Sequence, residues 1–127
     1  MHGPCPCGRP APYAQCCGRY HAGPERGWAP DAESLMRSRY SAYVLGLRDY
    51  LLDTWHPRIQ PGTIEPDPPG LRWLGLEVRR HERLDADHAS VEFVARSKLG
   101  GRARRLHETS RFERLDGHWF YVDGTLR

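Results

Sequence analysis

The sequence contains almost no lysine, no long apolar run and no cysteine after residue 17. Lys98 is the only lysine among 19 basic residues, and a formal net charge of +3 is too small to indicate nucleic-acid binding. No apolar run approaches the roughly 18 residues of a membrane-spanning helix, so we expect no membrane span. Cysteines confined to one end are unlike a secreted disulfide framework, which ties distant segments together.

The first residues have neither a basic start nor an apolar core, so the sequence predicts no signal peptide and a cytoplasmic location. A hydrophobic share of 39% with 10% aromatic residues argues against disorder. The 127 residues are enough for one principal domain that buries roughly two-thirds of its unfolded surface. We therefore expect a folded protein that needs no disulfides.

A change in composition near residue 28 divides the chain into two predicted parts. Residues 1–27 are rich in Gly, Pro and Cys and have no helical or strand periodicity, so something other than an apolar core must order them. Residues 28–127 carry regular patterns. Apolar residues recur at spacings of three and four between residues 30 and 47, which predicts an amphipathic helix ended by Gly46.

A second helix and four strands are predicted after Gly46. Asp49 is the expected N-cap of a short helix over residues 49–54, and five prolines and two glycines predict a loop over residues 57–70. Alternating residues and two Gly-containing turns, Gly100-Gly101 and Asp116-Gly117, predict an antiparallel meander. Its strands are expected at residues 71–81, 88–98, 103–115 and 118–123. The fold class is α+β, with helices on one face of a four-stranded sheet.

The four cysteines form two close pairs, Cys5/Cys7 and Cys16/Cys17, separated by eight residues. Tetrahedral zinc takes four thiolate ligands, and two such pairs on either side of a short loop can converge on one ion. A glycine after each pair, Gly8 and Gly18 in the sequence, gives the backbone freedom to wrap around a metal. Four protein ligands leave no position for water, so the predicted zinc site is structural.

Other chemistry for these thiols stays open at this point. Two disulfides between the pairs are disfavoured because adjacent Cys16 and Cys17 point apart in most backbone geometries. A redox dithiol usually has a C-x-x-C spacing, which is absent. The thiols could also be unrelated to each other, and His21 is close enough in sequence to replace one of them as a ligand.

The cysteine motif resembles a known zinc motif. Cys5-Pro6-Cys7-Gly8, then Tyr13, then Cys16-Cys17-Gly18 is similar to the SEC-C motif of the SecA translocation motor and of many small bacterial proteins. Later segments resemble the bacterial YchJ family in order and spacing over nearly the whole chain. They include Leu35-Met36-Arg37-Ser38-Arg39-Tyr40, Thr54-Trp55-His56-Pro57, Val91-Glu92-Phe93-Val94-Ala95-Arg96 and Gly117-His118-Trp119-Phe120-Tyr121-Val122-Asp123-Gly124-Thr125.

The resemblance implies a SEC-C zinc motif at residues 1–27 and a cone-shaped domain at residues 28–127. That domain is of the nuclear-transport-factor-2-like (cystatin-like) kind, with helices packed on a curved four-stranded antiparallel sheet. Domains of this kind can enclose a pocket that serves catalysis, ligand binding or only packing.

Candidate pocket residues come from the aromatic and polar side chains of the larger part. His107 and Arg111 share one face of the third predicted strand, whereas Glu108 and Ser110 share the other, and one of these faces should point inward. Arg39 is expected on the buried side of the first helix, paired with an acidic residue or a ligand anion. The predicted lining is Trp55, His56, Trp73, Arg96, His107, Arg111, Tyr121 and Asp123.

A closed metal site and the lack of any complete catalytic constellation predict a non-catalytic protein. Its expected cofactor is Zn²⁺, and its expected role is protein–protein interaction. The second hypothesis is that the pocket binds or turns over a small molecule, with His107 or Asp123 as acid or base. Nucleic acid and membranes are not expected partners.

Overall fold

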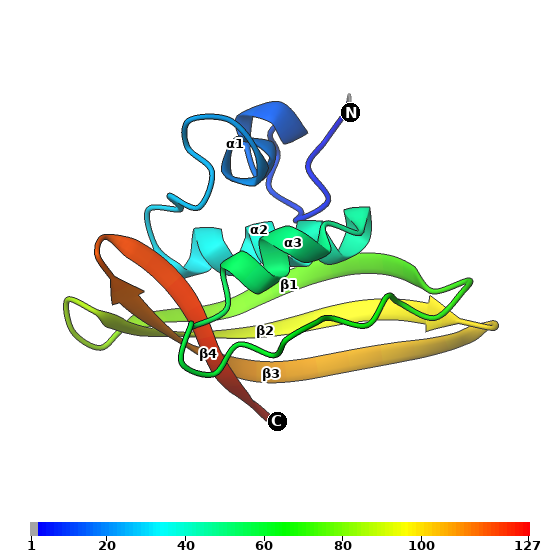
Figure 1. Cartoon of the computed structure of the whole chain (residues 1–127). Coiled ribbons are helices and arrows are strands. Elements are labelled where there is room, and N and C mark those ends of the chain that lie inside the picture. The colour runs from blue at the N-terminus through cyan, green and yellow to red at the C-terminus, as the bar shows by residue number, and fades with distance from the viewer. Residues whose placement is uncertain (1–2) are drawn as a thin grey trace.

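Helix α2 (Ala32–Leu45) lies between the N-terminal segment on one side and the β-sheet on the other (Figure 1). In the computed structural model, which describes residues 3–127, Asp31 caps this helix by accepting a hydrogen bond from the Ser34 N–H at 2.7 Å. Gly46 ends the helix in the left-handed conformation with φ of 73°. The predicted helix is confirmed, but it begins later than expected because Asp31 is extended and serves as its cap.

Helix α3 (Arg48–Asp53) follows almost at once and packs beside α2 (Figure 1). The prediction that Asp49 is its N-cap was wrong: Leu47 precedes the helix, and Asp49 lies in the first turn, where a carboxylate favours the helix dipole. Thr54 and His56 then attach the chain to the last strand through two backbone hydrogen bonds of 2.8 Å with Tyr121.

The sheet is an antiparallel meander in the order β1-β2-β3-β4, as predicted. Its strands are β1 (Arg72–Arg83), β2 (His88–Leu99), β3 (Arg102–Leu115) and β4 (His118–Leu126). Asp116 and Gly117 both have positive φ, as the tight turn between β3 and β4 requires. Strand β4 was expected to stop at Asp123 but continues, because Gly124 pairs with Ser110 and Leu126 with Glu108.

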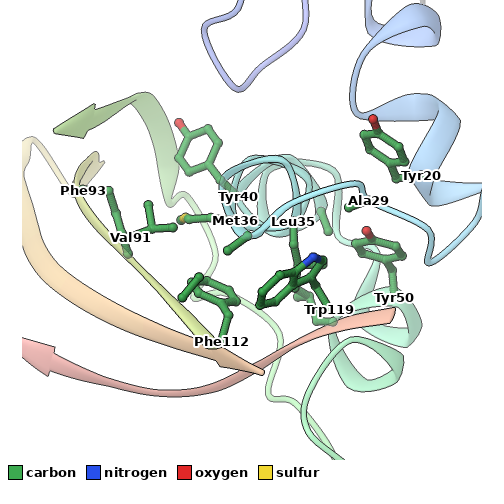
Figure 2. Packing of buried hydrophobic residues seen from close by; sticks show 14 of the residues in the cluster. Tyr20, Ala29, Leu35, Met36, Tyr40, Tyr50, Val91, Phe93, Phe112 and Trp119 are labelled. Carbon is green, nitrogen blue, oxygen red and sulfur yellow. The ribbon is translucent and has the colours of Figure 1, made fainter. Parts of the chain in front are cut away.

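The core packs between α2 and the inner face of the sheet (Figure 2). Leu35 and Met36 extend from the helix into this core, where they meet Val91, Phe112 and Trp119 from the strands. Leu35 and Val91 are wholly inaccessible to solvent, and Trp119 is 2% exposed. Burial of such side chains stabilises a fold by about 1.5–3 kcal/mol each.

The N-terminal segment forms a layer on the side of α2 that faces away from the sheet (Figure 1). It contains a 3-10 turn, η1 (Tyr13–Gln15), and one short helical turn, α1 (Gly18–His21). Tyr20 of α1 joins the main core cluster. The division of the chain at residue 27 stays a prediction. No helix in residues 3–127 is long and apolar enough to cross a membrane.

Candidate metal centre and cavity

The four cysteine sulfurs meet in one buried cluster. Cys5, Cys7, Cys16 and Cys17 each place Sγ within 4.8 Å of all the others, and all four side chains are buried. Cys7 Sγ lies 3.7 Å from Cys16 Sγ. A tetrahedral ion with Zn–S bonds of about 2.3 Å separates its sulfurs by about 3.8 Å. The cluster therefore has the ligand number and spacing of a tetrahedral thiolate metal site.

The crowding of the sulfurs also fits a cation at their centre. A hydrogen bond with Cys17 lowers the pKa of Cys7 to about 4, while burial raises the pKa of Cys16 to about 11. The pKa of Cys17 is raised as well, first by its hydrogen bond to Cys7 and then by burial. Without a cation, one thiolate is therefore favoured at the expense of its neighbours. A divalent ion would stabilise all four thiolates at once.

Two local features of the backbone bring the pairs together. A short bridge pairs Pro4 with Pro12, and the Cys5 N–H donates to Ala11 O at 2.9 Å. Gly8 turns the chain with φ of 92°, as expected of a glycine that follows the first pair. Gly18 has a different reason to be glycine: a Cβ there would lie 2.8 Å from the Tyr13 carbonyl oxygen.

Helix α2 carries a row of small hydroxyl residues, one of which contacts this cluster. Ser34, Ser38 and Ser41 are buried and share one face of the helix. Cys5 Sγ lies 3.7 Å from Ser41 Oγ, so a thiolate there can accept the hydroxyl hydrogen. Arg37 Nη1 donates to Cys7 O at 2.9 Å from the same helix. The metal loop is thus attached directly to the central helix.

His21 is not part of the sulfur cluster. Its Nε2 lies 2.7 Å from Ser38 O, and its Nδ1 lies 2.5 Å from the Tyr13 hydroxyl. A carbonyl oxygen only accepts, so Nε2 carries the hydrogen and Nδ1 accepts from Tyr13. Both ring nitrogens have hydrogen-bond partners. In this geometry His21 therefore does not replace a cysteine as a ligand. All four cysteines are free, so no disulfide is formed among them.

A second feature is a cavity of about 550 Å³ between α2 and the sheet. Its walls come from α2, from the segments after α3 and before β1, and from all four strands. The lining is mainly aromatic and includes Tyr40, Tyr43, Trp55, Trp73, Phe93, Phe112 and Tyr121. Its charged members are Arg39, Asp67, Arg104, Arg105 and Glu108. The volume lies within the range of about 300–1,000 Å³ typical of small-molecule sites.

Comparison with known proteins identifies the family. The family model for the middle, NTF2-like domain of YchJ matches residues 31–124. The chain belongs to the YchJ family. A UPF0225 protein from Methylibium petroleiphilum is 66% identical over 123 residues, which cover 97% of this chain and 88% of the relative. A UPF0225 protein from Bordetella pertussis is 56% identical over 123 residues, with 97% and 92% covered.

Solved structures of similar proteins share the fold. The solution structure of a SEC-C motif containing protein from Rhodopseudomonas palustris has a TM-score of 0.84 at 33% identity, covering 98% of each chain. The crystal structure of a SEC-C motif containing protein from Psychrobacter arcticus has a TM-score of 0.79 at 32% identity, covering 97% of this chain and 82% of that one. The predicted YchJ resemblance and fold class are thus confirmed.

Three of the eight predicted pocket residues of this YchJ-family chain line the cavity, namely Trp55, Trp73 and Tyr121. The other five, His56, Arg96, His107, Arg111 and Asp123, are absent from its lining. Two of these five residues lie on strand β3, where side chains alternate between the two faces of the sheet. Glu108 and Ser110 of this strand face the cavity. His107 and Arg111 therefore lie on the opposite face.

The five polar residues that do not line the cavity have charged partners elsewhere. His107 Nε2 lies 2.7 Å from Glu92 Oε2, and Arg111 Nη2 donates to Asp123 Oδ2 at 2.5 Å. Arg96 Nη1 lies 3.6 Å from a Glu77 oxygen. His56 is buried, but its Nε2 is 3.5 Å from Glu113 Oε2. None of these groups faces the cavity as an acid or base.

The predicted lining does not include Glu108 and Ser110, because the sequence leaves open which face of β3 points inward, and it leaves the partner of Arg39 open as well. Ser110 donates to Glu108 Oε2 at 2.5 Å inside the cavity. The signal was present in the alternation of β3, but both faces of this strand are polar, so composition alone does not say which face is inner. The register with β2 decides it: Phe93 pairs with Glu108 and Val91 with Ser110.

Proposed function

We propose that the four cysteines hold a structural Zn²⁺ ion and that this YchJ-family protein is a non-catalytic binding protein. The observation that carries the zinc proposal is the cluster of four buried sulfurs, all within 4.8 Å of one another. Four soft ligands at tetrahedral spacing suit zinc, and they leave no position for a reactive water. Four free thiols suit a reducing compartment, so we place the protein in the cytoplasm.

The proposed role of the ion is to order the N-terminal layer against α2. The cysteine-containing loop has little apolar core of its own apart from its sulfurs, Ala11 and Tyr13, and Leu76 of β1 packs against it. Zinc binding contributes about 10–16 kcal/mol in comparable small motifs at neutral pH, which is enough to order such a segment. The contacts of Cys5 with Ser41 and of Arg37 with Cys7 then fix that segment on the helix.

Metal analysis and X-ray absorption of the purified full chain test this proposal. We expect about one zinc per chain with a shell of sulfur only, at about 2.3 Å. The double variant Cys16→Ser/Cys17→Ser should lose the metal, whereas His21→Gln should keep it because His21 is bonded elsewhere. A shell that contains nitrogen, or a wild-type protein purified without zinc, would contradict the proposal.

The cavity gives the protein a second proposed role, the binding of a small molecule. Its 550 Å³ and its aromatic lining have the size and character of a ligand site. Among residues 3–127, no histidine or cysteine lines it, and its carboxylates accept hydrogen bonds from Trp73 and Ser110. These features support binding over catalysis.

A compound screen by thermal unfolding tests this role. Ligands that stabilise the zinc-loaded wild type should not stabilise Ala95→Leu, because the larger side chain fills part of the cavity.

A protein partner, expected from the sequence, is a further proposal, and Trp28 supports it. This tryptophan is 50% exposed and stacks on His118 with ring centroids 3.6 Å apart. Exposed, rigid aromatic residues are enriched at interfaces. Affinity capture tests this with the intact protein beside Trp28→Ala and Cys16→Ser/Cys17→Ser. We expect a partner that the wild type retains and both variants lose, and identical profiles would contradict the proposal.

A further inference from the structure

Arg39 is a buried cation without an anion beside it. Its side chain leaves α2 toward the cavity and the residue is only 5% exposed. Nη1 donates to Leu51 O at 2.8 Å and to Thr54 Oγ1 at 2.7 Å, both of them neutral acceptors. Among residues 3–127, no carboxylate lies within 4.0 Å of its guanidinium. Burying a charge is costly unless an opposite charge pairs with it.

The rest of the guanidinium is available from the cavity. Its Cζ lies 5.3 Å from the ring centroid of Trp55 and 4.8 Å from that of Tyr121. Nε and Nη2 form no hydrogen bond with any described residue. In the described part of the chain, the polar side-chain atoms that are fully buried without a partner are His81 Nε2 and Asp123 Oδ1. The free nitrogens of Arg39 therefore retain access to the cavity.

The charges around the cavity favour an anion. Arg39, Arg104 and Arg105 give three positive charges, and Asp67 and Glu108 give two negative ones, so the lining carries a net charge of +1. Asp67 is held by the Trp73 indole at 2.9 Å, and Glu108 by Ser110 at 2.5 Å. Both carboxylates are thus engaged by neutral donors. Arg39 is the charged group that remains buried and unpaired.

The remaining lining describes the body of the ligand. Tyr40, Tyr43, Trp73, Phe93 and Phe112 present rings, which favour a flat apolar partner. We propose that the cavity binds an organic acid with a flat aromatic or unsaturated body, whose carboxylate is received by Nε and Nη2 of Arg39. This ligand class rests on the proposed binding role of the cavity. A guanidinium edge is well suited to a carboxylate ligand, because its two N–H groups bind the carboxylate through two parallel hydrogen bonds.

Other occupants fit the same lining less well. A cation would meet Arg39 without a countercharge, and a neutral apolar molecule would gain nothing from the free nitrogens. Glu108 opposes an anion, since it faces the same space as Arg39. Glu108→Gln should therefore strengthen the binding of an acid while keeping the acceptor for Ser110. That expectation separates a carboxylate from every neutral ligand.

The test compares cinnamate with cinnamamide, which share a flat body and differ in charge. Each is titrated into the isotope-labelled, zinc-loaded full chain, and the four tryptophan indole N–H signals are followed by NMR. Trp55 and Trp73 line the cavity, whereas Trp28 and Trp119 do not and serve as internal controls. We expect shifts at the first two only, and at least about a tenfold tighter binding of cinnamate, as one charge-assisted hydrogen-bonded pair provides.

Variants assign the preference to Arg39. Arg39→Gln should abolish the difference in affinity between the two probes. Arg39→Lys keeps the charge but lacks the paired N–H groups of the guanidinium, so it should retain part of that difference. Glu108→Gln, which leaves Arg39 in place, should raise cinnamate affinity. Arg111→Gln is the matched control, because this arginine pairs with Asp123 on the other face of β3 and should change nothing.

Three results would overturn the inference in distinguishable ways. Equal affinity for cinnamate and cinnamamide, with shifts at Trp55 and Trp73, would refute the acid as ligand class while leaving the cavity a binding site. No shift at either tryptophan with any probe up to millimolar concentration would refute the binding role of the cavity as well. A preference that survives in Arg39→Gln would show that another group receives the carboxylate.

Discussion

His21 Nε2 donates a hydrogen bond of 2.7 Å to the backbone carbonyl of Ser38, in the middle of helix α2. The same ring accepts from Tyr13, which lies between the two cysteine pairs. One histidine thus links the metal loop to the central helix. Because Nδ1 must accept while Nε2 donates, the link requires the neutral form of the imidazole.

The first prediction concerns the protonation of this ring. Burial lowers the pKa of His21 from 6.5, whereas the hydrogen bond with Asp85 raises the pKa of the exposed His88. At pH 6.5 we expect His21 to be more than half neutral and His88 to be more than half protonated, observed as separate ring titrations by NMR. Because the folded pKa of His21 lies below its unfolded value, its contribution to stability is complete above pH 6.5 and declines as pH falls below it.

Replacement of His21 checks the linkage. The His21→Gln variant lacks the titrating ring, so its free energy of unfolding should fall less steeply than that of the wild type between pH 7 and pH 5.5. The comparison is made on zinc-loaded protein, with the metal content measured at each pH. Equal slopes in the two proteins, or a His21 that titrates above His88, would contradict this interpretation.

The metal cluster could be predicted from the sequence because its spacing is local. Cys5, Cys7, Cys16 and Cys17 lie within thirteen residues, so the loop between the pairs is short enough to bring them together. The helix α2 and the meander were likewise predicted, since periodicity and Gly-containing turns are local signals. The ends were less accurate: β4 continues past Asp123 because Gly124 pairs with Ser110, a contact between distant residues.

The cavity could not be predicted to the same extent. His107 and Glu108 are neighbours in sequence, and only the pairing of β3 with β2 decides which one faces inward. Arg39 reaches the cavity from the helix, yet its lack of an acidic partner depends on where Glu108 and Asp67 are held. The sequence gives no sign that Ser34, Ser38 and Ser41 are buried, because their burial depends on chain segments that pack over this face of α2.

Gly18→Ala is expected to weaken metal binding. A Cβ at this position would lie 2.8 Å from Tyr13 O and 2.9 Å from the Tyr13 ring, so the backbone next to Cys17 must shift. We expect a measurable loss of zinc affinity in competition with a chelator. Gly62→Ala is the matched control, because no atom lies within 4 Å of its added Cβ. Equal affinities in the two variants would show that the close approach does not constrain the ligands.

Removal of the metal should release the N-terminal layer and leave the sheet folded. The helix face beneath that layer carries Ser34, Ser38 and Ser41, and exposing hydroxyls to water costs far less than exposing apolar side chains. Hydrogen exchange after treatment with a chelator should show loss of protection over residues 5–21. Amides of β2 and β3 should stay protected. Loss of protection in the strands would mean that the two parts unfold as one unit.

Two tryptophans at the end of the sheet should differ sharply in their effect on stability. Trp119 is 2% exposed and packs in the main core beneath α2, where its ring also receives contacts from Arg83 and Arg114. Trp119→Ala should lower the free energy of unfolding by about 3–5 kcal/mol, because it leaves a cavity that the core cannot fill. Trp28→Ala removes a half-exposed ring stacked on His118 and should cost about 1 kcal/mol or less.

Urea unfolding of the zinc-loaded proteins measures the change in the free energy of unfolding for both variants. A Trp28 variant as unstable as the Trp119 variant would show that Trp28 holds the N-terminal layer in place, and it would remove the main argument for Trp28 as a partner-binding residue.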